Sequence, residues 1–143
     1  MSIESILRRK GRPDVTTIGP EANLKSAAGW LRAKNIGALV VTGENAVLGL
    51  ISEREIVDAF FRHGEAAGSM LVKEIMQHGV TTVSPDESVT RVMKLMTHQR
   101  MRHLPVVLGG KLVGIVSIGD VVKYRLEELE LEANVLRDYS ISR

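Results

Sequence analysis

Two short segments of the chain place a hydroxyl and a carboxylate three residues apart, directly after an apolar run. They are Ser52-Glu53-Arg54-Glu55 and Ser117-Ile118-Gly119-Asp120. If a buried strand ends and a helix begins there, the first helical amides have no acceptors and the helix dipole favours an anion. Ser117 can then donate to a phosphate oxygen, and Asp120 can accept from two neighbouring ribose hydroxyls. By itself the pattern favours simple helix capping over a ribose-phosphate site, and only the match of both copies described below reverses this preference.

The earlier segment departs from this pattern, because Glu55 stands where the later one has Asp120. The extra methylene moves the carboxylate by about 1.5 Å, which makes ribose binding beside Ser52 less favourable. Arg54 lies near the same helix start, where it is either a cation that grips phosphate or an exposed helix arginine.

The two segments belong to an internal repeat. Val15-Thr16-Thr17-Ile18 aligns with Val80-Thr81-Thr82-Val83 at an offset of 65 residues, and the same offset joins Ser52 to Ser117 without a gap. Each copy predicts strand, helix, strand, strand and helix. The expected helices cover 24–34, 53–62, 89–99 and 118–138, and the expected hairpin strands cover 38–41, 47–51, 103–107 and 112–116.

Polar residues mark where these elements begin and end. Asn23 and Ser88 precede the first helix of each copy and are expected to cap it. Gly64 is expected to end the helix over 53–62. Pro105 has no amide hydrogen for a strand ladder, so its strand should lie at a sheet edge, or Pro105 should lie at the start of the strand.

The repeat divides the 143-residue chain into five segments. They are an N-terminal helical lead (1–14), a first repeat (15–64), a linker with a short helix (65–79), a second repeat (80–125), and a C-terminal helix with its tail (126–143). A unit of this size buries too little surface to be stable alone. We therefore expect the two repeats to pack as one module.

Composition excludes several classes of function. The absence of cysteine removes disulfides, thiolate nucleophiles and Cys-ligated metals, and fits a reducing compartment. A net charge of +2 with 3% aromatic residues argues against nucleic acid as a partner. Neither a membrane-spanning apolar run nor a signal peptide is recognisable, so we expect a cytoplasmic protein that does not enter the membrane.

No catalytic constellation stands out. The histidines are scattered over turns and helix ends, with no regular spacing for a metal, at His63, His78, His98 and His103. No acid–base pair is recognisable. We therefore predict that the protein is not an enzyme and holds no metal.

Taken together, the Val-x-Thr entry, the amphipathic helix, the strand Arg102-His103-Leu104-Pro105-Val106 and the ending Gly-h-x-Ser-x-x-Asp resemble the CBS domain, named for cystathionine β-synthase. The resemblance covers about 15–125 and implies an α+β, α/β-like fold. Two β-α-β-β-α repeats would pack with pseudo-two-fold symmetry through their small sheets, followed by a C-terminal helical extension. Such a pair, a Bateman module, has two clefts for adenosine-containing ligands: AMP, ADP, ATP or NAD(H), and with less support S-adenosylmethionine.

The resemblance also implies the residues of each cleft. Thr17 and Thr82 would lie beside the adenine or ribose, and Ala38 and His103 would begin the strand that lines the base pocket. The first cleft is expected to hold Thr17, Ala38, Ser52, Arg54 and Glu55, and the second to hold Thr82, Arg102, His103, Ser117 and Asp120 with Arg100 nearby. Arg102 or His103 would meet phosphate, and the alternative for Arg100 and Arg102 is a solvated turn.

The expected function is regulatory: a sensor that binds an adenine nucleotide and signals to an unknown effector protein in trans. The C-terminal helix carries a heptad-like stripe that predicts either a short coiled coil or packing back on the module, formed by Val122, Leu126, Leu129, Ala133 and Leu136. Ile3, Ile6 and Leu7 could dock against this helix. CBS pairs commonly dimerise, so we expect a homodimer, and a homodimeric scaffold with no physiological nucleotide is the competing hypothesis.

Overall fold

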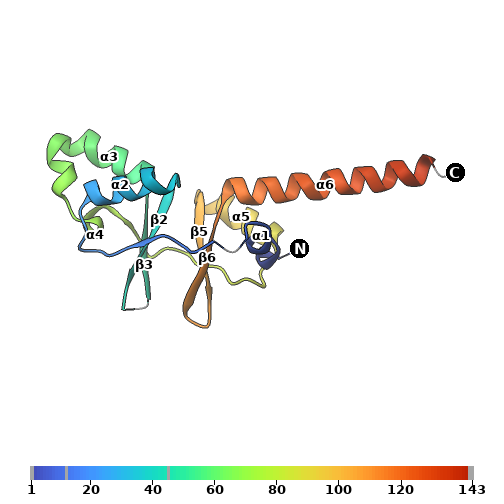
Figure 1. Ribbon diagram of the computed structural model, residues 1–143, viewed down its shortest axis with the longest axis horizontal. Coiled ribbons are helices and arrows are strands. Elements are labelled where there is room, and N and C mark those ends of the chain that lie inside the picture. Colours follow the sequence, from blue (N-terminus) through green and yellow to red (C-terminus); the bar gives the residue numbers. More distant parts are fainter. Residues whose placement is uncertain (1, 12, 45, 142–143) are drawn as a thin grey trace.

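The computed structural model describes residues 2–11, 13–44 and 46–141. Residues 1 and 142–143, at the ends of the predicted lead and tail, lie outside the described residues, as do Arg12 and Asn45. The two repeats stand side by side, with the hairpin ends of both sheets pointing the same way (Figure 1). This arrangement confirms the predicted α+β class, with small sheets covered by helices.

The first repeat comprises β1 (Thr17–Ile18), α2 (Leu24–Lys34), β2 (Ala38–Gly43), β3 (Ala46–Ser52) and α3 (Glu53–His63). The second comprises α5 (Val89–Gln99), β5 (His103–Leu108), β6 (Lys111–Ser117) and α6 (Ile118–Ile141). The helix α1 (Ile3–Arg9) precedes the first repeat. Between the repeats lie η1 (Gly64–Ser69), α4 (Val72–Ile75) and β4 (Gln77–His78). The predicted helices and hairpins are confirmed.

The predicted helix ends are also confirmed. Asn23 Oδ1 accepts from the Ser26 amide at 2.8 Å, and Ser88 Oγ accepts from the Arg91 amide at 3.1 Å. Each bond satisfies an amide that the helix itself leaves without an acceptor. Gly64 follows α3 with a φ of 60°, the left-handed region that suits glycine.

The two sheets differ at their entry strands. β1 pairs in parallel with β2 in a sheet of order β1-β2-β3-β4, whereas β5 and β6 form a two-stranded sheet. The expected second entry strand is reduced to a single bridge at Val83, and β5 is an edge strand, as Pro105 predicted. In the first repeat the amide of Val40 donates to Thr16 O. Pro105 occupies the equivalent position and has no hydrogen to donate, so the strand shortens there.

Each short helix that leads into a repeat completes the core of the other repeat. Ile3, Ile6 and Leu7 of α1 are buried among residues of the second repeat, including Val121 of α6. Val72 of α4 is buried in the core of the first repeat. The main-chain contacts match as well: Ile3 N donates to Glu87 O at 2.9 Å, and Val72 N donates to Ala22 O at 2.7 Å.

The repeats meet through their sheets, and a small third core fills the junction. Ala38, Val40 and Leu50 are buried there, with Val80 and Ile115 packed against them. At this junction the beginning of β2 lies near the end of β6, and the beginning of β5 lies near the end of β3. Both clefts described below are therefore shared between the repeats.

The C-terminal helix leaves the body of the protein (Figure 1). Val121 is its one buried residue in the described part, and Leu126, Leu129 and Leu136 are exposed to 55%, 44% and 68%. The expected continuous helix is confirmed. The expectation that the stripe packs back on the module is wrong, because α6 runs straight outward past its last contacts with α1 and α5.

Candidate ligand-binding clefts

One cavity of about 390 Å³ opens between the repeats, and we call it the Asp120 cleft. The second repeat contributes Ser117 and Asp120 from the start of α6, and the first contributes the turn from Asn35 to Ala38. This volume falls within the range of about 300–1,000 Å³ typical of small-molecule sites. The remaining lining residues are Leu7, Lys10, Pro13, Asp14, Val15, Thr16, His103, Val113, Gly114 and Ile115.

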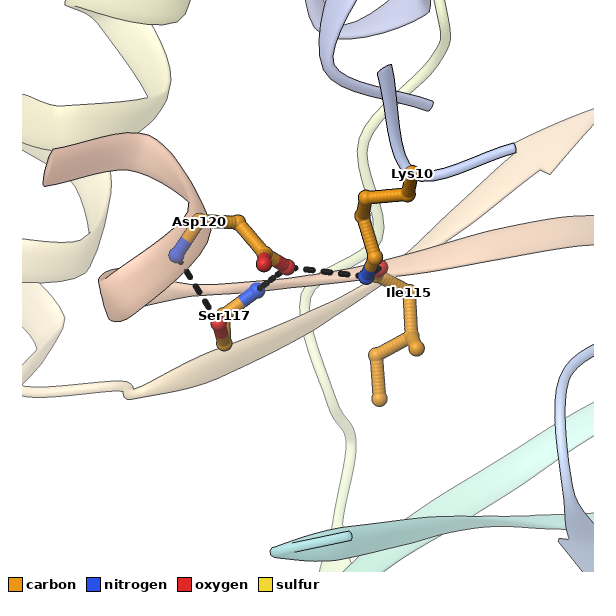
Figure 2. A network of polar contacts seen from close by, with 4 residues as sticks. All are labelled: Lys10, Ile115, Ser117 and Asp120. Carbon is orange, nitrogen blue, oxygen red and sulfur yellow. Dashed lines mark hydrogen bonds and ion pairs between the residues drawn. The ribbon is translucent and has the colours of Figure 1, made fainter. Parts of the chain in front are cut away.

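The start of α6 is closed by a reciprocal pair of hydrogen bonds (Figure 2). The Ser117 amide donates to Asp120 Oδ2 at 3.0 Å, and the Asp120 amide donates to Ser117 Oγ at 3.0 Å. These are the contacts that the capping alternative predicted. Both side chains also line the Asp120 cleft, so capping holds them in place at its wall.

Lys10 completes this network. Its Nζ donates to Asp120 Oδ2 at 2.8 Å and to Ile115 O at 2.9 Å (Figure 2). Burial alone would raise the pKa of Asp120, but the hydrogen bonds from Lys10 and Ser117 outweigh it and hold the pKa below its ordinary value. Asp120 is therefore a carboxylate at neutral pH.

A second, smaller cavity of about 160 Å³ lies at the pseudo-symmetric position, and we call it the Arg54 cleft. The first repeat contributes Ser52 and Arg54 from the start of α3, and the second contributes the turn from Arg100 to His103. Its remaining lining residues are Gly37, Leu50, Glu53 and Gln77. Its volume is below the usual range for a nucleoside-sized ligand.

Glu55 is held away from the Arg54 cleft by local bonds. Its Oε1 accepts from the Ser52 amide at 2.8 Å and from Ser52 Oγ at 2.6 Å, and its Oε2 accepts from Gln77 Nε2 at 3.0 Å. The longer side chain folds back over the helix start and uses its acceptors there. Glu55 therefore does not line the Arg54 cleft, and its lower suitability as a ribose acceptor stays a prediction.

His103 and Gly37 form the wall between the two clefts, since both residues line both cavities. A Cβ added to Gly37 would lie 3.4 Å from His103 Nε2, so the ring packs closely on the glycine. Burial lowers the pKa of His103; Asp120 and Glu55 oppose this effect, and Arg102 and Lys10 add to it. The imidazole is therefore kept neutral to a lower pH than a free histidine.

The structure corrects the grouping expected from the sequence. Ala38 lines the cleft at the start of α6 in the second repeat, and Arg102 lines the cleft at the start of α3 in the first. Each cleft therefore combines the helix start of one repeat with the beginning of the first hairpin strand of the other. Thr16 lines the Asp120 cleft, whereas Thr17 is exposed at the hairpin side of the module. Successive residues of an extended chain point to opposite faces, so Thr16 and not Thr17 lines this cleft, and the ligand contact expected of Thr17 stays a prediction. Thr82 is exposed and lines neither cleft.

Two of the cleft residues that sequence reasoning missed, Lys10 and Gln77, form hydrogen bonds to the carboxylates at the helix starts. Lys10 reaches Asp120 from 110 residues away, and no local pattern connects them. Gln77 lies in the segment expected to be a linker, yet it pairs with Leu50 as part of β4. The repeat itself held one signal: α1 and α4 carry similar apolar spacing, Ile6-Leu7 and Ile75-Met76, just before each copy.

No group of three or more His, Cys, Asp or Glu side chains is placed to hold a metal ion in 2–11, 13–44 and 46–141. Within the same ranges, no helix combines the length and hydropathy needed to traverse a bilayer.

Two repeats that pack through their sheets and share two clefts at their junction define the chain as a tandem-repeat module. The family model described as the CBS domain matches residues 4–62 and 72–127. The chain therefore belongs to the CBS-domain family. CBS-domain pairs are known regulatory modules that often bind adenine nucleotides.

Solved structures and curated relatives agree. The crystal structure of the CBS-domain containing protein ATU1752 from Agrobacterium tumefaciens is 42% identical, with a TM-score of 0.83, covering 87% of this chain and 99% of that one. A hexameric CBS-CP12 protein from cyanobacteria is 27% identical, with a TM-score of 0.75, covering 85% and 69%.

The curated CBS domain-containing protein CBSX3, mitochondrial, from Arabidopsis thaliana is 40% identical over 110 residues, or 73% of this chain. The chain spans 53% of the length of that relative.

Proposed function

We propose that this protein is a regulatory module that binds an adenosine-containing nucleotide, AMP or a close relative, in the Asp120 cleft. One observation carries the proposal. The half-buried carboxylate of Asp120 and the hydroxyl of Ser117, at the start of α6, line a cavity of about 390 Å³ that both repeats form. The helix start favours a phosphate, and the carboxylate favours vicinal hydroxyls. A nucleotide carries both groups at a fixed separation.

The cleft also suits the base. Its walls include the apolar side chains of Val113 and Ile115 and the main chain of residues 36–38. Main-chain amides and carbonyls can pair with the edge of adenine, and aliphatic side chains can cover its faces. An aromatic platform is not needed, which fits a chain with 3% aromatic residues.

Titration calorimetry with AMP, ADP, ATP, NAD(H) and S-adenosylmethionine tests the proposal. We expect micromolar binding, roughly 8 kcal/mol, of at least one of them. Asp120→Asn keeps an acceptor for the Ser117 amide but removes the charge and one acceptor, so we expect affinity to fall at least about tenfold. Asp58→Asn on exposed α3 is the control and should bind as the wild type does. No heat and no thermal shift with any ligand would refute the proposal.

The signal would pass from the cleft to a partner protein. A ligand that touches both repeats stabilises one relative packing of them over another, and a partner that reads this packing senses the ligand. This regulatory role requires no catalysis by the chain. The effector in trans and the cytoplasmic location stay predictions.

A homodimeric scaffold is the second candidate, and exposed apolar side chains favour it. Phe61 of α3 is 88% exposed and Val57 of the same helix is 68% exposed. They and the stripe on α6 would be covered in a dimer. A dimer in light scattering, together with no ligand binding in calorimetry, would favour the scaffold.

A further inference from the structure

Lys10 is the cation of the Asp120 cleft. Among the described residues that line it, Asp14 and Asp120 are acidic and Lys10 alone is a strong base, with the neutral form of His103 favoured by burial. The Arg54 cleft has the opposite balance, with Arg54, Arg100 and Arg102 against Glu53. An anionic ligand entering the Asp120 cleft therefore meets two carboxylates and depends on one lysine.

The twin position shows that a charge is not needed merely to hold the carboxylate. Glu55 occupies the place of Asp120 in the first repeat, and its partner is the neutral amide of Gln77 at 3.0 Å. A neutral donor is thus sufficient to complete this type of helix start. The positive charge at Lys10 calls for a further explanation.

The main chain of Lys10 is held by α1, since its amide donates to Ile6 O at 3.0 Å, whereas its side chain is partly exposed. Lys10 follows α1, whose apolar side chains are buried in the second core. Lys10 and Asp120 also line a neighbouring pocket with Arg9, Lys123 and Tyr124. The side chains of Lys10 and Asp120 keep about a quarter of their area exposed, at 27% and 25%.

We propose that Lys10 selects for phosphorylated ligands in the Asp120 cleft. The ribose hydroxyls replace Lys10 as hydrogen-bond donors to Asp120, and the released ammonium group of Lys10 binds the 5′-phosphate. The exchange leaves both groups with hydrogen-bond partners, because Asp120 gains two hydroxyl donors while Lys10 gains a phosphate oxygen. Adenosine, which has no phosphate, would take the carboxylate and leave the ammonium without a new partner. This inference rests on the proposed function.

Lys10→Gln is the variant that tests it, because glutamine keeps a neutral amide donor, the type of group that Gln77 offers Glu55, and removes the charge. We expect its dissociation constant for AMP to rise about tenfold, the size of one lost charge-assisted hydrogen bond. The constant for adenosine should stay within about twofold or fall, since Asp120 is held less tightly. Lys10→Arg keeps the charge and should keep the preference for AMP.

Lys73→Gln is the matched control, because Lys73 lies on α4, the counterpart of α1, and pairs with Glu21 away from both clefts. It should bind both ligands as the wild type does. Thermal unfolding establishes that each variant is folded. If Lys10→Gln weakens AMP and adenosine equally, or neither, the role of Lys10 is overturned while nucleotide binding stands. If the wild type binds neither ligand, the proposed function falls as well.

Discussion

The two glycines in the middle of β3 and β6 offer a matched test of how the segments that precede each repeat pack against these strands. Gly49 and Gly114 are equivalent positions of the repeat, and each faces a residue just before a copy. A Cβ at Gly114 would lie 2.7 Å from Leu7 Cδ2, the end of a side chain. A Cβ at Gly49 would lie 2.4 Å from the main-chain oxygen of Gln77 and 2.8 Å from Met76 Sδ.

The two alanine variants should therefore differ in stability. Leu7 can move its side-chain end by a small rotation, so Gly114→Ala should cost about 1 kcal/mol. Gln77 is held in main-chain pairing with β3, so Gly49→Ala must separate two strands and should cost about 3 kcal/mol. For a chain of this length these losses lower Tm by roughly 4 °C and 10 °C respectively.

Urea unfolding of the wild type and both variants, followed by circular dichroism, measures the difference. Both expected losses are net of the stabilisation that alanine gives by lowering the entropy of the unfolded chain, up to about 1 kcal/mol, which is the same at both positions. The difference between the two variants is thus the informative quantity. Equal losses, or a larger loss for Gly114→Ala, would refute the argument that a main-chain contact is the costlier one.

Two other features can be tested in the same way. Because the pKa of His103 is lowered in the folded protein, the unfolded chain binds its proton first as pH falls below about 6.5, so this histidine destabilises the fold progressively there. Replacing it by glutamine should flatten the decline in stability between pH 7 and pH 5.5, and an unchanged slope would contradict this. Truncation after Glu128 should leave Tm within about 2 °C, since the removed residues up to 141 are exposed. The homodimer is a prediction that light scattering of the full chain tests. If that dimer forms, its loss in the same truncation would assign dimerisation to the tail, and its persistence would assign dimerisation to the repeats.

Local features of the fold could be predicted because they depend on spacing within one element. The helices over 24–34 and 89–99 begin and end where the apolar stripe and the caps indicated. The reciprocal bonds of Ser117 and Asp120 follow from residues three apart at a helix start. The identity of the threonine in the Asp120 cleft could not be obtained this way, because a one-residue change in strand register exchanges Thr16 for Thr17.

By itself, the sequence determined that the chain is a duplicated strand-helix-strand-strand-helix unit and that the two copies differ in the carboxylate at the second helix start, Glu55 in one and Asp120 in the other. Both features depend on residue types at a fixed spacing, so they can be recognised without knowing how the chain packs. Tertiary structure alone decided that each lead helix completes the opposite core, that Ala38 faces Asp120, and that Lys10 holds this carboxylate. These contacts join residues as many as 110 positions apart, and only the packing of one repeat against the other brings them together.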